Sequence, residues 1–429
     1  MKKNRTKKTP REALVPSGRP GPTSRSPLPE GGLDSRKALF EVVLAQGFAG
    51  VMQMLEEDRE RLCGPSRLWR SEREAYRHGY GEGRLVLGGR KVLVPKPRVR
   101  GVNGREVELP TWKRFAEEDP LDRRVLEQLA VGVSTRSYER SLDPLPEELE
   151  SSTTSRSSVS RRFVALTKKR VDEFLARPLG DLDLRAILLD GRGMGDHTLV
   201  VALGIDSSGR KHVLGTAEGS TESEQVCVAL LRSLTERGVK IERARLFVID
   251  GGKGLRKAIR TVFGSWALIQ RCQVHKMRNV LDHLPQGKRT WVRAAMRRAW
   301  AQQDVAKARA RLKDLAGQFE EVHPGAASSI LEGLDETLTV IGLGLSGGLL
   351  RTMSSTNAIE NVQGTLARVS RNVKRWRGGT MALRWGVTGL LEAEKKFRRV
   401  RGHSDMPILI AAIEALVEGT TLDRKKRVA

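Results

Sequence analysis

The chain has 429 residues, with 77 Lys and Arg against 51 Asp and Glu, a formal net charge of +26 and a sequence pI near 10.5. This length exceeds one ordinary domain and suggests a multidomain enzyme, and the charge favours nucleic acid as partner, although an Arg-rich composition from a GC-rich genome is the alternative. Three scattered cysteines argue against a disulfide framework and favour a reducing cytoplasm, and the absence of a long apolar run argues against membrane insertion.

The N-terminal third of the chain begins with a segment of low hydrophobicity. Residues 1–36 mix Lys and Arg with Pro, Gly and Ser, which predicts a disordered basic arm. Apolar residues recur at helical spacing from Lys37 to about Leu62 and predict one or two short helices. Two β-prone runs around a Gly-Gly pair, from Gly83 to Pro95, predict a hairpin. We therefore expect residues 37–115 to form a small α/β module.

Residues 116–178 contain two helix-like segments. The first runs from Asp122 to Val131, and the second places apolar residues on one stripe from Val159 to Phe174. Arg161 and Arg162 lie on the other side of that stripe. The pattern is typical of a helix-turn-helix whose second helix enters a major groove of DNA. A helical hairpin with an ordinary solvated face is an equally good interpretation.

Strand-like runs replace the helices at about Leu182. The residue pattern predicts three strands, a helix, a strand, a helix and a strand within residues 179–287. This order is that of a ribonuclease-H-like core, so the predicted fold class is α/β with a mixed sheet, preceded by mostly helical DNA-binding modules. Three further segments are expected: an all-α insertion at 288–350, the final core helix and a basic segment at 351–402, and a C-terminal helix with a basic tail at 403–429.

Two of the predicted strands end in an acid that a glycine follows, at Asp190-Gly191 and Asp250-Gly251. A single acid after a strand is more often a turn or cap residue than a ligand. In a ribonuclease-H-like sheet, however, the first and fourth strands are neighbours, so both carboxylates would meet at one site. Carboxylate oxygens suit Mg²⁺, with Mn²⁺ as a substitute, and two ions about 3.5 to 4 Å apart can promote phosphodiester transfer.

Ordered sequence blocks over roughly residues 120–405 resemble the Mutator-type transposases of bacterial insertion sequences. The blocks are Leu189 to Gly191, Leu203 to Asp206, Val213 to Gly215, Val248 to Gly251, Gln270 to Asn279, Thr356 to Glu360 and, more weakly, Gly132 to Arg136. The resemblance implies an Asp-Asp-Glu transposase in which Asp190, Asp250 and Glu360 are the catalytic and metal-binding residues. The glycine-rich segment from Arg192 to Asp196 departs from the family pattern.

Glu360 depends most on this resemblance, because its position alone does not separate it from Glu332, Asp335 and Glu336. Thr356 and Asn357 precede it and predict a helix cap, which would place Glu360 in the first turns of a helix.

The family signature Cys272-x-x-His275 has no assigned role. Two such residues supply only half of a tetrahedral zinc site, so a structural or DNA-facing role is the better interpretation.

A basic segment follows Glu360 and is predicted to be a helix that lies along DNA. Its candidate DNA contacts are Arg368, Arg371, Lys374, Arg375 and Arg377. Trp385 is expected in the core, whereas Trp376 has a contact with a base or sugar as its alternative.

The resemblance thus implies a DNA transposase that binds terminal inverted repeats, cleaves and transfers DNA strands, and uses two Mg²⁺ ions per site. The expected partners are the double-stranded DNA of the element ends and of the target. A homodimer or larger assembly, associated with the nucleoid in the cytoplasm, is expected when the protein acts. A domesticated DNA-binding protein without catalysis and a ribonuclease-H-like nuclease are the alternatives.

Overall fold

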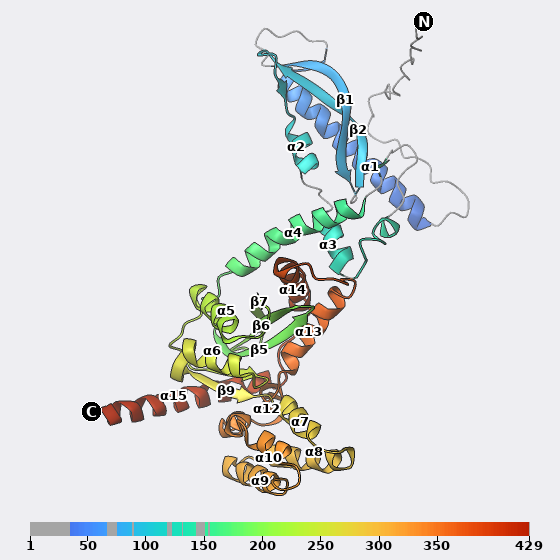
Figure 1. Ribbon diagram of the computed structural model, residues 1–429. Coiled ribbons are helices and arrows are strands. Elements are labelled where there is room, and N and C mark those ends of the chain that lie inside the picture. Colours follow the sequence, from blue (N-terminus) through green and yellow to red (C-terminus); the bar gives the residue numbers. More distant parts are fainter. Residues whose placement is uncertain are drawn as a thin grey trace, which may run out of the picture. The chain divides into compact units, whose positions relative to one another are not determined.

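The computed structural model describes residues 35–66, 75–87, 90–117, 122–130, 132–142, 151–152 and 155–428 (Figure 1). The predicted basic arm therefore lies almost entirely outside the described residues. The chain is mixed α/β, as expected, and it divides into two compact units. The first unit comprises Met1–Glu82, Pro95–Trp112 and Asp143–Glu150, and the second comprises Gly83–Val94, Lys113–Leu142 and Ser151–Ala429. No described helix is long and apolar enough to cross a bilayer. The domain boundaries expected from the sequence remain predictions.

One long helix, α1 (Ser35–Cys63), replaces the one or two short helices expected near the N-terminus. It contacts β1 (Ala75–Leu87), because Arg59 donates to the Tyr80 hydroxyl at 2.7 Å and lies 4.6 Å from the centroid of that ring. The predicted hairpin appears as β1 beside β2 (Arg90–Gly101), with the Gly-Gly turn outside the described residues. The sheet also contains β3 (Glu106–Val107) and β4 (Ser151–Ser152), and α2 spans Pro110–Glu117.

The strands of this hairpin extend well beyond the predicted 83–95. Buried Val92, Val94 and Val99 show that the apolar positions of the second strand continue past Pro95 and Pro97. Both helices and strands are present in residues 37–115, as expected.

The two helices expected in residues 116–178 are present as α3 (Asp122–Ala130) and α4 (Arg156–Ala176). Ser155 caps α4, because its side chain accepts a hydrogen bond from the backbone N–H of Ser158 at 3.2 Å. The predicted apolar stripe is buried at Val159, Phe163, Val171 and Phe174. A helix with one apolar stripe must pack against another element, and α4 packs against α14 (Gly379–Glu394), where Phe163 lies 4.6 Å from Trp385.

The central sheet has five strands in the order β7-β6-β5-β8-β9. In chain order these strands are β5 (Leu184–Met194), β6 (His197–Asp206), β7 (Lys211–Gly219), β8 (Arg245–Ile249) and β9 (Ala267–Arg271), with α5 (Glu224–Glu236) and α6 (Lys253–Phe263) on either side of β8 in sequence. The predicted order of strands and helices is therefore confirmed. The atypical glycine-rich segment forms the end of β5 and the turn to β6, where Gly195 has a φ of 66° that favours glycine.

Helices cover both faces of this sheet (Figure 1). Because side chains alternate along a strand, Ala186 and Leu188 of β5 face one layer, and Ile187 and Leu189 face the other. The layer at Ala186 and Leu188 contains α13 (Asn357–Val369), α14 and the start of α15 (Met406–Val428), and the layer at Ile187 and Leu189 contains α5 and α6.

A group of helices lies between β9 and α13 in sequence and forms a core of its own. Its members are α7 (Gln273–Asp282), α8 (Gln286–Trp300), α9 (Val305–Gly317), α10 (Pro324–Leu331) and part of α11 (Thr339–Gly342). Val280, Val292, Leu312 and Ile330 are among the buried residues that these helices share. The next helix, α12 (Gly347–Met353), packs into the core of the central sheet through Leu349 and Met353. The helical pattern expected for residues 288–350 is therefore present.

Candidate active site

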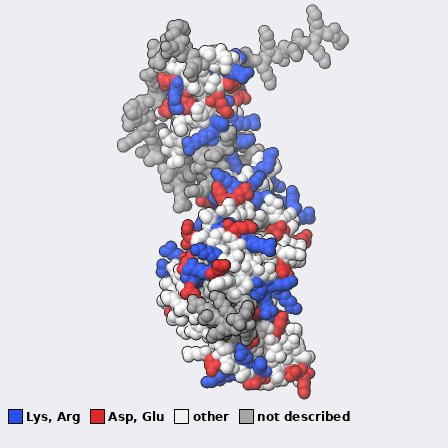
Figure 2. Space-filling model, turned by 90° about the vertical axis from the view of Figure 1, so that its left-hand side faces the viewer, with Lys and Arg blue, Asp and Glu red and all other residues white. Residues whose placement is uncertain are grey.

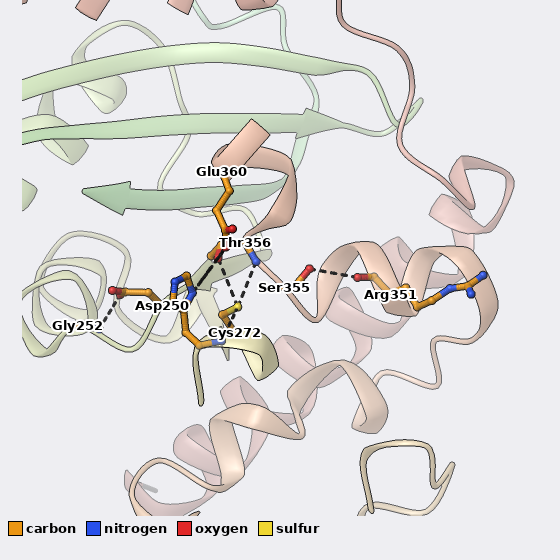
Figure 3. A network of polar contacts seen from close by, with 8 residues as sticks. Asp250, Gly252, Cys272, Arg351, Ser355, Thr356 and Glu360 are labelled. Carbon is orange, nitrogen blue, oxygen red and sulfur yellow. Dashed lines mark hydrogen bonds and ion pairs between the residues drawn. The ribbon is translucent and has the colours of Figure 1, made fainter. Parts of the chain in front are cut away.

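Asp190 and Asp250 lie side by side where the parallel pairing of β5 with β8 ends. Asp250 directly follows β8, whereas β5 continues past Asp190 to Met194, so the expectation that this strand ends at Asp190 was wrong. Leu189 of β5 is in register with Ile249 of β8, so the residues that directly follow them, Asp190 and Asp250, are neighbours. Neighbouring strands are about 4.8 Å apart, which brings the two carboxylates to one edge. Asp190 is buried, with 7 % of its surface exposed. Asp250 accepts a hydrogen bond from the backbone N–H of Gly252 at 2.8 Å (Figure 3).

Glu360 lies in the first turn of α13 and approaches this edge from the helix layer. Its carboxylate accepts a hydrogen bond from Thr356 Oγ1 at 3.0 Å and lies 3.8 Å from His275 Nδ1. The charge of Glu360 also acts on Asp190. The three acids are separated by 250 − 190 = 60 and 360 − 250 = 110 residues in sequence, and the fold brings them together.

The three acids that sequence position could not separate from Glu360 all pair with cations elsewhere. Glu332 accepts from Arg271 at 3.1 Å, Asp335 pairs with Arg309 at 2.8 Å, and Glu336 pairs with Arg256 at 2.5 Å. Of these four candidates, only Glu360 is among the charges that act on Asp190.

Cys272 and His275 connect the start of α7 to the start of α13. The Cys272 sulfur accepts hydrogen bonds from the backbone N–H and the hydroxyl of Thr356, at 3.4 and 3.3 Å, and from the backbone N–H of His275 at 3.5 Å. Figure 3 shows Glu360 pointing toward Thr356, with the sulfur beyond it. Thr356 does not cap α13 through its side chain, as the sequence suggested, because the hydroxyl is used in these contacts instead. The signature residues therefore help to position Glu360.

The sequence prediction missed Glu222, a further acid at this edge. The helix predicted from residue 222 begins at Glu224, because Ser223 caps it and accepts from Val226 N at 3.4 Å. Glu222 therefore precedes the helix. A serine cap directly after an acid was the available signal, but sequence alone does not show where that acid points.

Burial and like charge raise the pKa values of two of these carboxyls. Burial raises the pKa of Asp190 to about 7, with Asp250 and Glu360 adding to the effect and His275 opposing it. Burial, Asp250 and Asp190 together raise the pKa of Glu222 to about 7. Within the described part of the chain, no three His, Cys, Asp or Glu side chains are arranged to hold a metal ion as they stand. Carboxylates so close together repel one another when no cation lies between them.

The sulfur and imidazole of the signature affect each other's ionisation. Burial acts to raise the pKa of Cys272, but hydrogen bonds from His275 and Thr356 outweigh it and lower that pKa. The hydrogen bond with Cys272 raises the pKa of His275, and the nearby charges of Glu360 and Asp190 add to this effect. These effects favour the protonated form of His275 beside the acids.

The candidate DNA contacts lie on two surfaces of the second unit. Arg161 is exposed and Arg162 partly exposed on α4. Of the five candidate DNA contacts that follow Glu360, only Arg368 is on a helix, because α13 ends at Val369. The expected basic helix is therefore wrong there, and four exposed residues lie on the loop from α13 to α14: Arg371, Lys374, Arg375 and Arg377.

Packing and charge set limits on this basic surface. Trp376 is partly buried and packs against the core beside α14, which supports packing over a base contact. In Figure 2, Lys and Arg are spread over the visible face with Asp and Glu among them, so net charge alone does not define a DNA path there.

Comparison with known proteins supplies independent information on this architecture. Residues 37–399 match the family model described as "Transposase, Mutator family". The chain is 28% identical over 325 residues to the transposase for insertion sequence element ISRM5 of Rhizobium meliloti, covering 74% of this chain and 79% of the relative. It is 26% identical over 345 residues to the transposase for IS256 in transposon Tn4001 of Staphylococcus aureus (77% and 85%), and 28% identical over 356 residues to the transposase for IS406 of Burkholderia multivorans (78% and 88%).

Proposed function

Since the chain belongs to the Mutator family of transposases, we propose that it is the transposase of an insertion sequence. It binds the terminal inverted repeats of its element, cuts DNA there and joins the released ends to target DNA. The observation that carries this proposal is the meeting of Asp190, Asp250 and Glu360 at one edge of the sheet. The strand and helix order supports a ribonuclease-H-like core with α8 to α12 as an insertion before its final helix.

The donor set at this edge fits divalent magnesium. Asp190, Asp250 and Glu360 supply hard carboxylate oxygens, which Mg²⁺ prefers, and Mn²⁺ accepts the same ligands. The raised pKa of Asp190 reflects burial beside other negative charges, and a cation would relieve that repulsion. When bound, a pair of such ions polarises the phosphate and activates the attacking hydroxyl group.

The protein groups around the acids hold and orient them. Thr356 fixes one oxygen of Glu360 by a hydrogen bond at 3.0 Å, and Cys272 fixes Thr356 in turn. The backbone N–H of Gly252 holds one oxygen of Asp250, which leaves the other oxygen for a ligand. Gly191 and Gly251 flank the acids, and the absence of a side chain leaves room for the Glu222 carboxylate at Gly191 and for the Arg271 guanidinium at Gly251.

DNA recognition is assigned to α4 and to the loop between α13 and α14. The loop also contacts the segment after α3, because Asn372 donates to the backbone oxygen of Gly132 at 2.5 Å. Neutralising phosphates releases counterions, so affinity should fall steeply with salt, with a log-log slope of about −0.9 per phosphate contacted. Because both element ends take part in one reaction, we propose that the active form is at least a dimer.

The experiment is strand cleavage and joining on labelled end DNA in Mg²⁺ or Mn²⁺, beside a gel-shift on the same protein. Asp250→Asn and Glu360→Gln keep size and hydrogen bonding but remove the charge that binds a cation. Both variants should lose cleavage by about 100-fold or more and still bind the ends. Undiminished cleavage by Asp250→Asn would overturn the metal assignment. A wild-type protein that binds ends but never cuts would be a domesticated binder, and one that cuts without joining would be a nuclease.

A further inference from the structure

Glu222 is a partly buried carboxylate that is not one of the three proposed metal ligands. It lies in the connection before α5, directly ahead of the capping Ser223. Within the described residues, its Oε1 atom is buried and has no hydrogen-bond partner. A buried carboxylate without a partner destabilises a fold unless something else compensates its charge. The structure therefore lacks the group that would balance Glu222.

Two glycines make room for the Glu222 carboxylate beside the aspartates. A Cβ atom at Gly191 would overlap Glu222 Oε2. A Cβ atom at Gly252 would lie 2.9 Å from Glu222 Oε1 and 3.3 Å from Asp250 Oδ1. Gly191 directly follows Asp190, and Gly252 is two residues after Asp250. The carboxylate therefore occupies the space between the two segments that carry the aspartates.

Glu222 and Glu360 belong to opposite layers of the sheet. Glu222 precedes α5, which covers the face of Ile187 and Leu189, whereas Glu360 is on α13, which covers the other face. The charges of Asp250 and Asp190 act on Glu222, with that of Asp250 the larger, whereas Glu360 acts on Asp190. The two glutamates therefore approach the aspartate pair from different sides.

We propose that Glu222 is a fourth carboxylate ligand of the divalent metal site, binding a cation together with Asp250 from the side of α5. The inference rests on the proposed function for the presence of such cations. It accounts for the orphaned Oε1 atom, because a cation would supply the missing partner, and for both glycines, because their missing side chains let the Glu222 carboxylate reach the aspartates.

The test is isothermal titration of the full-length, metal-free protein with Mn²⁺, comparing wild type, Glu222→Gln and Glu224→Gln. Glu224 is the matched control, because it loses the same charge from the same helix start but pairs with Lys257 at 2.7 Å. Glu222→Gln should weaken Mn²⁺ binding by about 10- to 100-fold, the range for groups that support a metal site. Glu224→Gln should bind as the wild type does. Equal affinities in all three proteins overturn the proposal.

Thermal unfolding separates a ligand from a structural residue. Without metal, Glu222→Gln should melt at the wild-type temperature or above it, because it removes an uncompensated charge. The rise in melting temperature that Mn²⁺ produces should shrink in this variant. A lower melting temperature without metal, together with an unchanged Mn²⁺ effect, would show a structural role and overturn the proposal. If the Gln variant does not fold, Glu222→Asp should still bind Mn²⁺ more weakly than wild type, and unchanged binding overturns the proposal.

These measurements also distinguish this inference from the proposed function. If the wild type cuts DNA and Glu222→Gln binds Mn²⁺ as the wild type does, only the role of Glu222 fails. If the wild type binds Mn²⁺ but does not cut DNA, the proposed function fails, and the titrations still decide whether Glu222 is a ligand. A wild type that binds no Mn²⁺ overturns both.

Discussion

Two polar sites near the segment from Arg271 to Lys276 differ in whether groups of the same chain compensate their charges. In the first site, Lys276 is fully buried, yet its Nζ donates to the backbone oxygens of Ser329 and Glu332, both at 2.6 Å. Arg271 donates to the Glu332 carboxylate at 3.1 Å. Burial and the charge of Arg271 lower the pKa of Lys276 to about 8, which leaves it largely protonated at neutral pH. We call Arg271, Lys276 and Glu332 the balanced site.

In the second site, beside the aspartate pair, the carboxylates have too few cationic or hydrogen-bonding partners. Asp190 and Glu222 are held among further negative charges, and both have pKa values near 7. Charges that serve the fold are matched by groups of the same chain, as in the balanced site. Carboxylate charges that no group of the same chain compensates indicate that a ligand compensates them. Removing charge at the two sites should therefore have opposite effects on activity and stability.

The largest effect is expected from Asp190→Asn on DNA cleavage. Cleavage should fall by on the order of 1,000-fold, because the substitution removes the negative charge that holds a cation at the reacting phosphate. The stability of the metal-free protein should stay the same or rise. Glu332→Gln makes the same change of charge in the balanced site, where it should lower the melting temperature and leave cleavage nearly intact. Equal losses of cleavage in both variants would remove the distinction between the sites.

The pH dependence of stability should reveal the unmatched acids directly. The pKa of Asp190 is about 7 in the fold against an ordinary 3.8, so the folded protein keeps a proton that the unfolded chain has released. Raising the pH from about 4 to about 7 should therefore lower the free energy of unfolding, by at most roughly 4 kcal/mol at about 1.4 kcal/mol per unit. Urea unfolding in a chelator measures this loss. Asp190→Asn should flatten the profile, and saturating Mg²⁺ should do so too.

Lys276→Met tests the balanced site itself. It leaves Glu332 and two backbone oxygens without their buried donor, so the free energy of unfolding should fall by about 3 kcal/mol. Lys257→Met is the control, because Lys257 is exposed and its ion pair with Glu224 should contribute less than about 1 kcal/mol. Chemical denaturation of the two variants gives the comparison. Similar small losses in both would show that the buried lysine does not need its charge.

The smallest effect is expected at Thr356, which contacts both Cys272 and Glu360. Thr356→Val removes the hydroxyl that links Cys272 to Glu360 and should slow cleavage by about 5- to 10-fold, in line with about 1 kcal/mol for one hydrogen bond. Thr356→Ser restores the hydroxyl and should recover most of the rate. A purely structural role would lower the melting temperature of both variants without this difference in cleavage.

Local sequence patterns were enough to predict that Asp190 and Asp250 are neighbours, because each follows an apolar run on one of two adjacent parallel strands. The pattern Asp-Gly marks the end of β8, but β5 continues past Asp190 to Met194, where it still pairs with β6. Glu360 required the family resemblance, because its three competitors differ from it only in tertiary ion pairs with distant arginines. Such pairs depend on packing that no local pattern contains.

Two other predictions were wrong because tertiary contacts overrode a local sequence rule. Thr356 looked like a helix cap, but its hydroxyl is used by Cys272 and Glu360, which come from other parts of the sequence or from the next turn. The basic segment after Glu360 looked helical because Arg and Lys are good helix formers. Instead, α13 ends at Val369, and the chain then turns beside Gly132.

The packing of α4 on α14 has a consequence for where the element is cut. Phe163 and Trp385 hold the proposed reading helix to the same body that carries the acids. The protein then fixes the number of base pairs between the DNA sequence that α4 contacts and the phosphate that is cleaved. DNA turns once in about 10.5 base pairs, so inserting about five between the two would move the phosphate to the far face of the duplex. Cutting should stop there, and it should resume only when a whole turn restores the phase and the DNA bends to close the added length.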